Sequence, residues 1–109
     1  MTDDLPPFSV SVMETPEGPV VMPHGELDMA TADEAEQVAL ALVTSEQPSL
    51  TIDLSDVTFC DSAGVNALVR LRKVCHEAGG KLTVSNPRPN VRQVLDLSGL
   101  TEFLSVTPR

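Results

Sequence analysis

A serine hydroxyl next to a carboxylate is the feature of this sequence most suited to chemistry. Asp61 and Ser62 lie in the segment FCDSAGV, residues 59–65, where an apolar run has ended and a helical pattern begins. A side chain at such a turn is exposed and meets the free backbone N–H groups of a helix start. This geometry suits a residue whose charge is changed by another protein. The competing interpretation is that both residues only begin and cap the helix.

Two predicted elements position this turn. The apolar run at residues 50–54 predicts a buried strand before it. A helix is predicted from residue 62 or 63 to about residue 78, because apolar residues recur at spacings of four and three. Gly79-Gly80 ends that helix. Residues 57–60 (VTFC) are interpreted as the approach to the helix rather than as a strand.

The N-terminal region predicts a hairpin. Residues 8–12 alternate between apolar and polar with the period of a half-buried strand, and residues 20–22 (VVM) form a second apolar run. Between them, residues 15–19 (TPEGP) have the composition of a turn. The first strand is therefore expected to run antiparallel to the second.

A helix is predicted next, over about residues 31–43, because its apolar residues fall on one face. The segment GELD at residues 25–28 is expected to lead out of the sheet toward this helix. Either Asp28 or Thr31 can cap its start, and the sequence does not decide between them.

The C-terminal region predicts a short strand at residues 82–84, a helix around residues 91–95 closed by Gly99, and a last strand at residues 103–106. The order of elements is then β-β-α-β-α-β-α-β. Strands and helices that alternate in this way imply right-handed crossovers and an α/β fold with a mixed, mostly parallel sheet.

The length of 109 residues predicts a single domain over residues 1–109, with residues 1–6 as a flexible N-terminal tail. Sixteen acidic residues against seven basic ones give a net charge of −9. A nucleic acid or a membrane surface would repel this chain, and three Phe without Trp or Tyr offer little to stack on bases. A partner with a basic surface is the natural counterpart. With an acidic start and no long apolar run, the chain is expected in the cytoplasm.

The cysteines and histidines predict no metal, cofactor or disulfide. Cys60 and Cys75 are separated by about 20 Å of predicted helix, which is too far for a disulfide, and both are expected to be reduced core residues. No close set of Cys and His suggests zinc. His24 and His76 are distant in sequence, and neither shows an obvious carboxylate partner. A glycine-rich phosphate loop is missing, so the chain is expected not to bind ATP.

Three segments resemble the STAS domain, specifically the single-domain bacterial anti-sigma factor antagonists. They are GELD at 25–28, DLSDVTFCDSAG at 53–64 and LDLSGL at 95–100. The middle segment is the specific one. Together with the order of elements, the resemblance covers nearly the whole chain and implies a single-domain STAS fold.

The resemblance implies a regulatory protein and not an enzyme. In that family, the serine after the aspartate in the Asp-Ser-x-Gly turn is phosphorylated by the anti-sigma factor, which is also a serine kinase; here that serine is Ser62. Only the unphosphorylated antagonist binds the anti-sigma factor and frees the sigma factor, and a metal-dependent serine phosphatase resets the system. The resemblance implies partner contacts at the residues Asp28, Asp61, Ala63, Gly64 and Asn66. This chain departs from the family's pattern at two positions: it has Ala63 where relatives often carry a second Ser or Thr, and Asn66 where several well-known members have Gly.

Other hypotheses stay open. Ser55 and Ser98 are rival acceptors, although their places in a turn and at a helix end favour structural roles. A second hypothesis is a STAS subunit that is not phosphorylated and serves a lipid-transport ATPase at the membrane, with Ser62 as a contact residue. A third is a small hydrolase that uses Ser62, which the missing Gly-x-Ser-x-Gly motif disfavours.

Overall fold

The computed structural model describes residues 7–108. The predicted tail at residues 1–6 lies outside the described residues. The N-terminal hairpin is confirmed: β1 (Ser9–Thr15) runs antiparallel to β2 (Gly18–Leu27). Ser9 pairs with His24 and Thr15 with Gly18, so the two strands match along the whole of β1.

The rest of the main sheet is parallel, as expected. β2 is followed in space by β3 (Leu50–Asp53), β5 (Leu82–Ser85) and β6 (Val106–Thr107), in the order β1-β2-β3-β5-β6. Side chains of β3 and β5 alternate between buried and half-buried, since one face of the sheet meets the core. The α/β fold class with a mixed, mostly parallel sheet is confirmed.

The structure corrects the order of elements by one strand. Residues Val57–Cys60 form β4, which pairs in parallel with the end of β2, and the order becomes β-β-α-β-β-α-β-α-β. β2 reaches this partner because it continues to Leu27 with a shift of register between Gly25 and Glu26, so the prediction that residues 25–28 leave the sheet was wrong. The bulge turns β2 from β3 toward β4.

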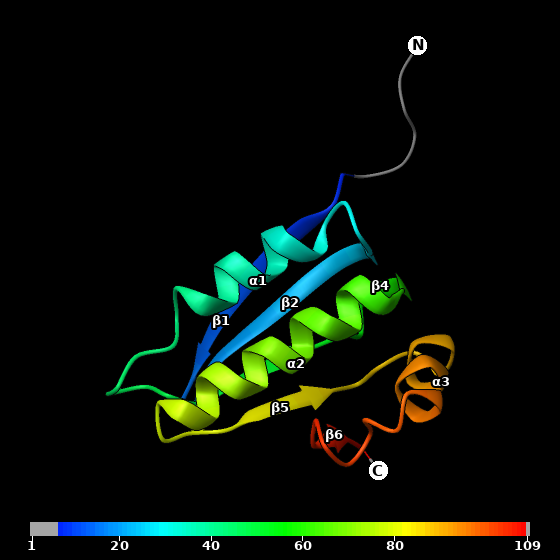
Figure 1. Cartoon of the computed structure of the whole chain (residues 1–109). Coiled ribbons are helices and arrows are strands. Elements are labelled where there is room, and N and C mark those ends of the chain that lie inside the picture. The colour runs from blue at the N-terminus through cyan, green and yellow to red at the C-terminus, as the bar shows by residue number, and fades with distance from the viewer. Residues whose placement is uncertain (1–6, 109) are drawn as a thin grey trace.

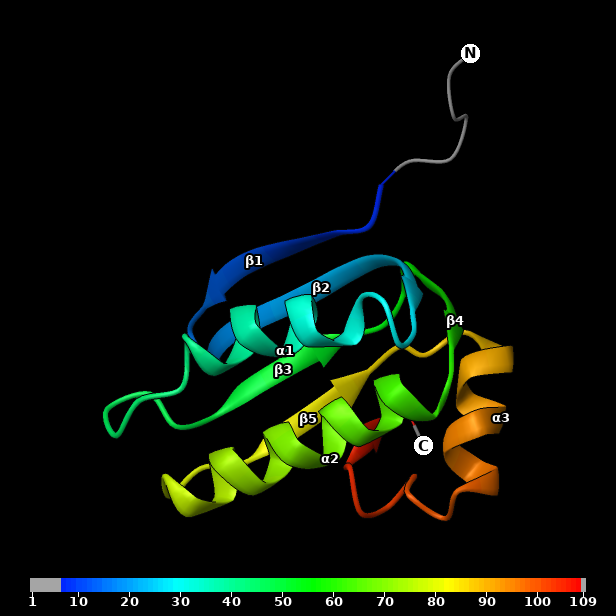
Figure 2. The ribbon, with the colours of Figure 1, turned by 45° about the horizontal axis from the view of Figure 1, so that its top comes forward.

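Within residues 7–108, three helices accompany the sheet. α1 (Ala32–Leu40) and α2 (Ser62–Glu77) lie side by side on one face of the sheet, and α3 (Pro89–Leu97) stands at its end beside β4 (Figures 1 and 2). α1 ends at Leu40, three residues earlier than predicted. Thr31 is its N-cap residue, without a capping bond from its side chain.

The core lies between the sheet and the helices. Its largest fully buried side chains come from β2, β5, α2 and α3 and from the segments that follow β3 and α3: Leu27, Leu54, Leu68, Leu82, Leu95 and Leu104. Glu36 of α1, although buried, forms three hydrogen bonds with Arg70 of α2, so the two helices are tied together by a bidentate ion pair. Cys60 and Cys75 are both buried and unbridged, as expected. Among the described residues, no helix is long and apolar enough to cross a membrane.

Candidate functional site

Asp61 and Ser62 form the junction between β4 and α2. Asp61 has extended backbone and is the N-cap residue of α2, and its Oδ1 accepts hydrogen bonds from the backbone N–H groups of Ala63 at 2.9 Å and Gly64 at 3.3 Å. An aspartate in this position satisfies two of the free N–H groups of the helix start. Asp61 therefore caps α2, which the sequence had left as one possibility.

Ser62 is the first residue of α2, and its side chain is exposed. In the described part of the chain, no hydrogen bond joins Ser62 Oγ to a histidine or a carboxylate. The hydroxyl is therefore reachable by another protein but has no base of its own. A nucleophilic serine needs such a base, which argues against the hydrolase that would use Ser62.

Asp28 lies next to this junction because β2 and β4 run in the same direction and end together. Leu27 pairs with Cys60, and the Asp61 N–H donates to the Leu27 carbonyl at 3.3 Å. Asp28 itself turns the chain toward α1, since its Oδ1 accepts from the Ala30 N–H at 2.9 Å. The structure thus brings Asp28 and Asp61 to one edge of the sheet.

Gly64 is buried at the point where α2 comes closest to β2. A Cβ atom at this position would lie 2.7 Å from Cys60 Sγ and 2.8 Å from the Leu27 carbonyl oxygen. Both distances are too short for carbon, so only glycine lets the first turn of α2 sit against β2. Gly64 therefore fixes the spacing between the Asp61–Ser62 junction and Asp28.

The remaining predicted contacts fall in the same area. Ala63 is half-buried in the first turn of α2, and Asn66 is exposed four residues after Ser62, on the same side of the helix. All six residues that the sequence analysis assigned to the site are brought together. Of these six, Ser62 and Asn66 are exposed, whereas Gly64 is buried and acts through packing.

Two exposed apolar side chains beside this junction were missed. Met29, which follows Asp28, is 82% exposed, and Phe59 of β4 is 47% exposed. Phe59 carried a signal in the sequence, because it is a bulky apolar residue in a short segment without helical spacing. Met29 carried none. We call Asp28, Met29, Phe59, Asp61 and Ser62 together the Ser62 surface.

The charge of the Ser62 surface is not neutralised. No salt bridge among the described residues involves Asp28, Asp61 or the neighbouring Glu26. Beneath it, burial and, to a smaller extent, the Asp61 carboxylate raise the pKa of the Cys60 thiol to about 11. Cys60 is therefore a neutral packing residue at physiological pH.

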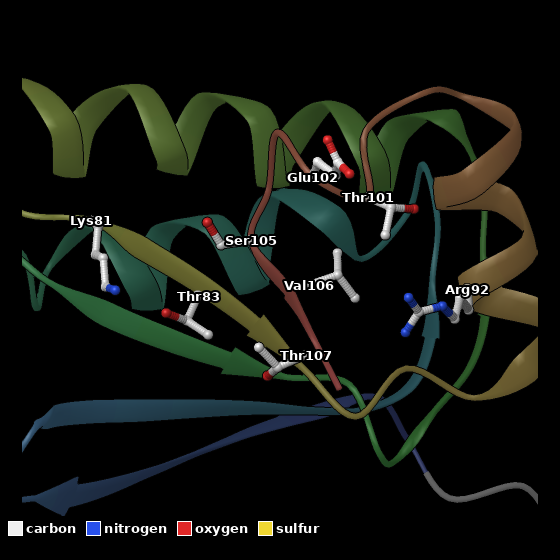
Figure 3. A pocket seen from close by; sticks show the side chains of 8 residues that line it. All are labelled: Lys81, Thr83, Arg92, Thr101, Glu102, Ser105, Val106 and Thr107. Atoms are coloured by element: carbon white, nitrogen blue, oxygen red, sulfur yellow. The ribbon is translucent and has the colours of Figure 1, made fainter. Parts of the chain in front are cut away.

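A separate hollow of about 380 Å³ lies between β5, β6 and the segment before β6, as Figure 3 shows. It is lined by Lys81, Thr83, Arg92, Thr101, Glu102, Ser105, Val106 and Thr107. None of these residues was assigned to the site from the sequence, and none belongs to the Ser62 surface. The Ser62 surface therefore stands apart from this hollow.

Comparison with known proteins identifies the family. The STAS domain model matches residues 10–109. The anti-sigma F factor antagonist of Paenibacillus polymyxa is 28% identical over 88 residues, which are 80% of this chain and 75% of that protein. The crystal structure of an anti-sigma factor antagonist from Mycobacterium paratuberculosis has a TM-score of 0.83 and 31% identity, and the match covers 94% of this chain and 87% of that one.

The same fold occurs in the Bacillus cell fate determinant SpoIIAA. Its unphosphorylated form matches with a TM-score of 0.72 and 23% identity over 94% of this chain and 90% of that chain. Its phosphorylated form matches with a TM-score of 0.68 and 22% identity over 94% and 93%. At this identity, the likeness concerns the fold alone.

Proposed function

Because the chain belongs to the STAS domain family, we propose that it is an anti-sigma factor antagonist controlled by phosphorylation of Ser62. In its unphosphorylated form, it binds an anti-sigma factor that is also a serine kinase, and this binding releases the sigma factor. Phosphate on Ser62 prevents binding, and a metal-dependent serine phosphatase removes it. The relatives named as anti-sigma factor antagonists support this class of function.

The observation that carries the proposal is the exposed Ser62 hydroxyl on a surface fit for a protein partner. Met29 and Phe59, at the ends of the strands that lead to this junction, supply exposed apolar area, which a protein partner can cover. The uncompensated carboxylates of Asp28 and Asp61 favour a partner with basic groups. A kinase that docks here reaches the hydroxyl it modifies.

Phosphate would act on the partner rather than on the fold. It adds about −1.5 to −2 charges at neutral pH. The N–H groups of Ala63 and Gly64, which would otherwise receive an anion, already donate to Asp61. The phosphate therefore stays in solvent beside Asp61 and Asp28, where it repels an acidic group or loses its water when a partner covers the turn. The SpoIIAA structures agree with this view, since that protein has the same fold in both forms.

Intact-mass analysis after incubation with candidate anti-sigma kinases and Mg-ATP tests the proposal. We expect a gain of one phosphate that is lost in Ser62→Ala and kept in Ser55→Ala and Ser98→Ala, the matched controls at the two rival serines. Phosphate that persists in Ser62→Ala would contradict the assignment of the site. Co-purification with a membrane ATPase complex, without any phosphate, would favour the lipid-transport subunit instead.

A further inference from the structure

A second cluster of reactive side chains lies away from the Ser62 surface, on β1, β2 and the turn after β3. His24 Nδ1 lies 2.7 Å from Asp56 Oδ2, and His24 Nε2 lies 2.8 Å from Ser11 Oγ. The expectation that His24 lacks a carboxylate partner was therefore wrong. Serine, histidine and aspartate are joined in a chain, with the hydroxyl on one ring nitrogen and the carboxylate on the other.

The register of the hairpin places Ser11 beside His24. Ser9 is directly opposite His24 and Ser11 is opposite Met22, so Ser11 is the diagonal neighbour of His24 on the same face. Diagonal pairs are within reach of a long side chain. Val21 is fully buried toward the helices, and because side chains alternate along a strand, His24 points to the other face.

Backbone contacts hold Asp56 next to Nδ1 of the His24 ring, opposite the nitrogen that contacts Ser11. The Gly25 N–H donates to the Asp56 carbonyl at 3.0 Å, which fixes the turn between β3 and β4 against β2. Arg88 Nη2 lies 3.9 Å from Asp56 Oδ1, and the Arg88 Nε–H donates to the Ser55 carbonyl at 2.8 Å. Arg88 is thus an ion-pair neighbour of one carboxylate oxygen of Asp56, and the other oxygen is hydrogen-bonded to His24.

The hydrogen bonds have one direction when the imidazole is neutral. An ionised carboxylate only accepts, so Nδ1–H donates to Asp56, and the lone pair on Nε2 accepts from the Ser11 hydroxyl. A hydroxyl that donates to a neutral imidazole can lose its proton to that imidazole as it attacks a carbonyl. Serine hydrolases use the same connectivity on unrelated folds.

Space for a small substrate lies directly beside the cluster. A hollow of about 430 Å³ is lined by Ser11, His24 and Asp56 together with four neighbours, Pro7, Ser9, Gly25 and Thr58. Its size is that of a pocket for a small molecule. The His24 side chain is 31% exposed, so a ligand in the hollow meets both the imidazole and the hydroxyl.

We propose that Ser11, His24 and Asp56 form an acyl-transfer site that hydrolyses small carboxylic esters. Ser11 Oγ bonds to the ester carbonyl carbon while its proton passes to His24 Nε2. The bond from that carbon to the alkoxy oxygen then breaks, and the alcohol leaves with this proton. Water attacks the acyl-Ser11 ester and gives a proton to His24, which returns it to Ser11 Oγ as the acid leaves. Asp56 is a positioning residue that holds the imidazole in the required tautomer.

The competing interpretation is that the three side chains only tie the hairpin to the turn at Asp56. A structural tie would affect thermal stability without creating a nucleophile. Reactivity of Ser11 therefore separates the two interpretations, and the proposed regulatory role of Ser62 does not enter the comparison.

The test uses the full chain, p-nitrophenyl acetate as substrate and a fluorophosphonate as a covalent probe followed by intact-mass analysis and peptide mapping. We expect turnover above the buffer rate and one label on Ser11 in the wild type. Ser11→Ala should lose both, and His24→Gln should lower kcat by about 100-fold or more, as loss of a general base does. Ser98→Ala, an exposed serine elsewhere, is the control that keeps both.

The role of Asp56 has to be tested by a measurement that would not change if this residue were only structural. We expect Asp56→Asn to lower kcat at least about tenfold with KM within twofold, and Asp56→Glu to restore part of kcat. Turnover that survives Ser11→Ala, label on Ser62 instead of Ser11, or no turnover and no label in the folded wild type would each overturn the proposal.

Discussion

Ser62 and Ser11 are both exposed hydroxyls, yet their surroundings differ in one decisive respect. Ser62 lies at a helix start next to Asp61, whose carboxylate accepts hydrogen bonds from the backbone. In the described part of the chain, no imidazole contacts Ser62. Ser11 Oγ lies 2.8 Å from an imidazole nitrogen of His24, and the other nitrogen of that ring is hydrogen-bonded to the Asp56 carboxylate. The contrast teaches that exposure alone does not define the chemistry of a serine: the proposed phosphorylation of Ser62 needs a second protein, whereas an imidazole lies against Ser11 within the same fold.

The largest expected effect concerns partner binding. Ser62→Asp should weaken binding to the anti-sigma kinase proposed as the partner by about thirty-fold to several-thousand-fold, because an uncompensated charge at an interface costs about 2–5 kcal/mol. Titration calorimetry measures the affinity. Ser11→Asp adds the same charge in the other region and should change the affinity less than about threefold. Equal losses of affinity in the two variants would contradict the difference proposed between Ser62 and Ser11.

Gly64→Ala comes next and tests how the Ser62 surface is built. Alanine normally stabilises a helix relative to glycine by about 1 kcal/mol. Here its Cβ would lie 2.7 Å from Cys60 Sγ and 2.8 Å from the Leu27 carbonyl oxygen, so we expect a net loss of about 1–3 kcal/mol in the free energy of unfolding. Urea denaturation measures it. Asn66→Ala on the exposed side of the same helix is the control and should be neutral or slightly stabilising.

The two aspartates should differ in their contribution to stability. Asp61→Ala removes a cap that accepts two backbone N–H groups and should cost about 1 kcal/mol, and Asp61→Ser should recover most of that loss. Asp56→Ala removes exposed interactions and should cost less than Asp61→Ala, because exposed ion pairs contribute about 0–1 kcal/mol. The reverse order would mean that the cluster of Ser11, His24 and Asp56, not the Ser62 surface, carries the structural role.

The smallest expected effect is a pH dependence of the protein's stability that comes from the Cys60 thiol, beneath the Ser62 surface. The folded-state pKa of Cys60, about 11, lies above its ordinary value of 9.0, so folding favours the neutral thiol. This contribution to stability is fully present below pH 9.0 and is lost as the pH rises toward about 11. Thermal denaturation between pH 9.0 and about pH 11 should show a fall in Tm, and this fall should be smaller in Cys60→Ala. A decline of the same size in that variant would assign it to other groups.

The start of α2 was predictable because its signals are local. Asp61 caps the two N–H groups that follow it, and the apolar spacing of the helix needs no distant partner. β4 was missed because its burial pattern, buried at Val57 and Cys60 and exposed between them, does not alternate. Sequence periodicity does not report a strand that lies at the end of a sheet and has a single neighbour.

Errors elsewhere also have physical causes. Val43 extends the apolar pattern of α1 past Leu40, where the helix ends, because it packs against the core from the following turn. The last strand begins only at Val106, since Ser105 has a φ of 52°, outside the extended region. The contact of His24 with Asp56 spans 32 residues, a separation that no local pattern encodes.

Gly25 lies in β2 between the residues that position Ser11 and those that position Ser62. Its φ of 117° is strained for any other residue, and at this point β2 shifts from one neighbouring strand to the next. On one side of it stands His24, and two residues beyond it stands Leu27, whose carbonyl anchors Asp61. Any residue other than glycine should strain the backbone at this point and impair both the proposed switch at Ser62 and the proposed reaction at Ser11, so a genetic screen for loss of either should recover the same codon.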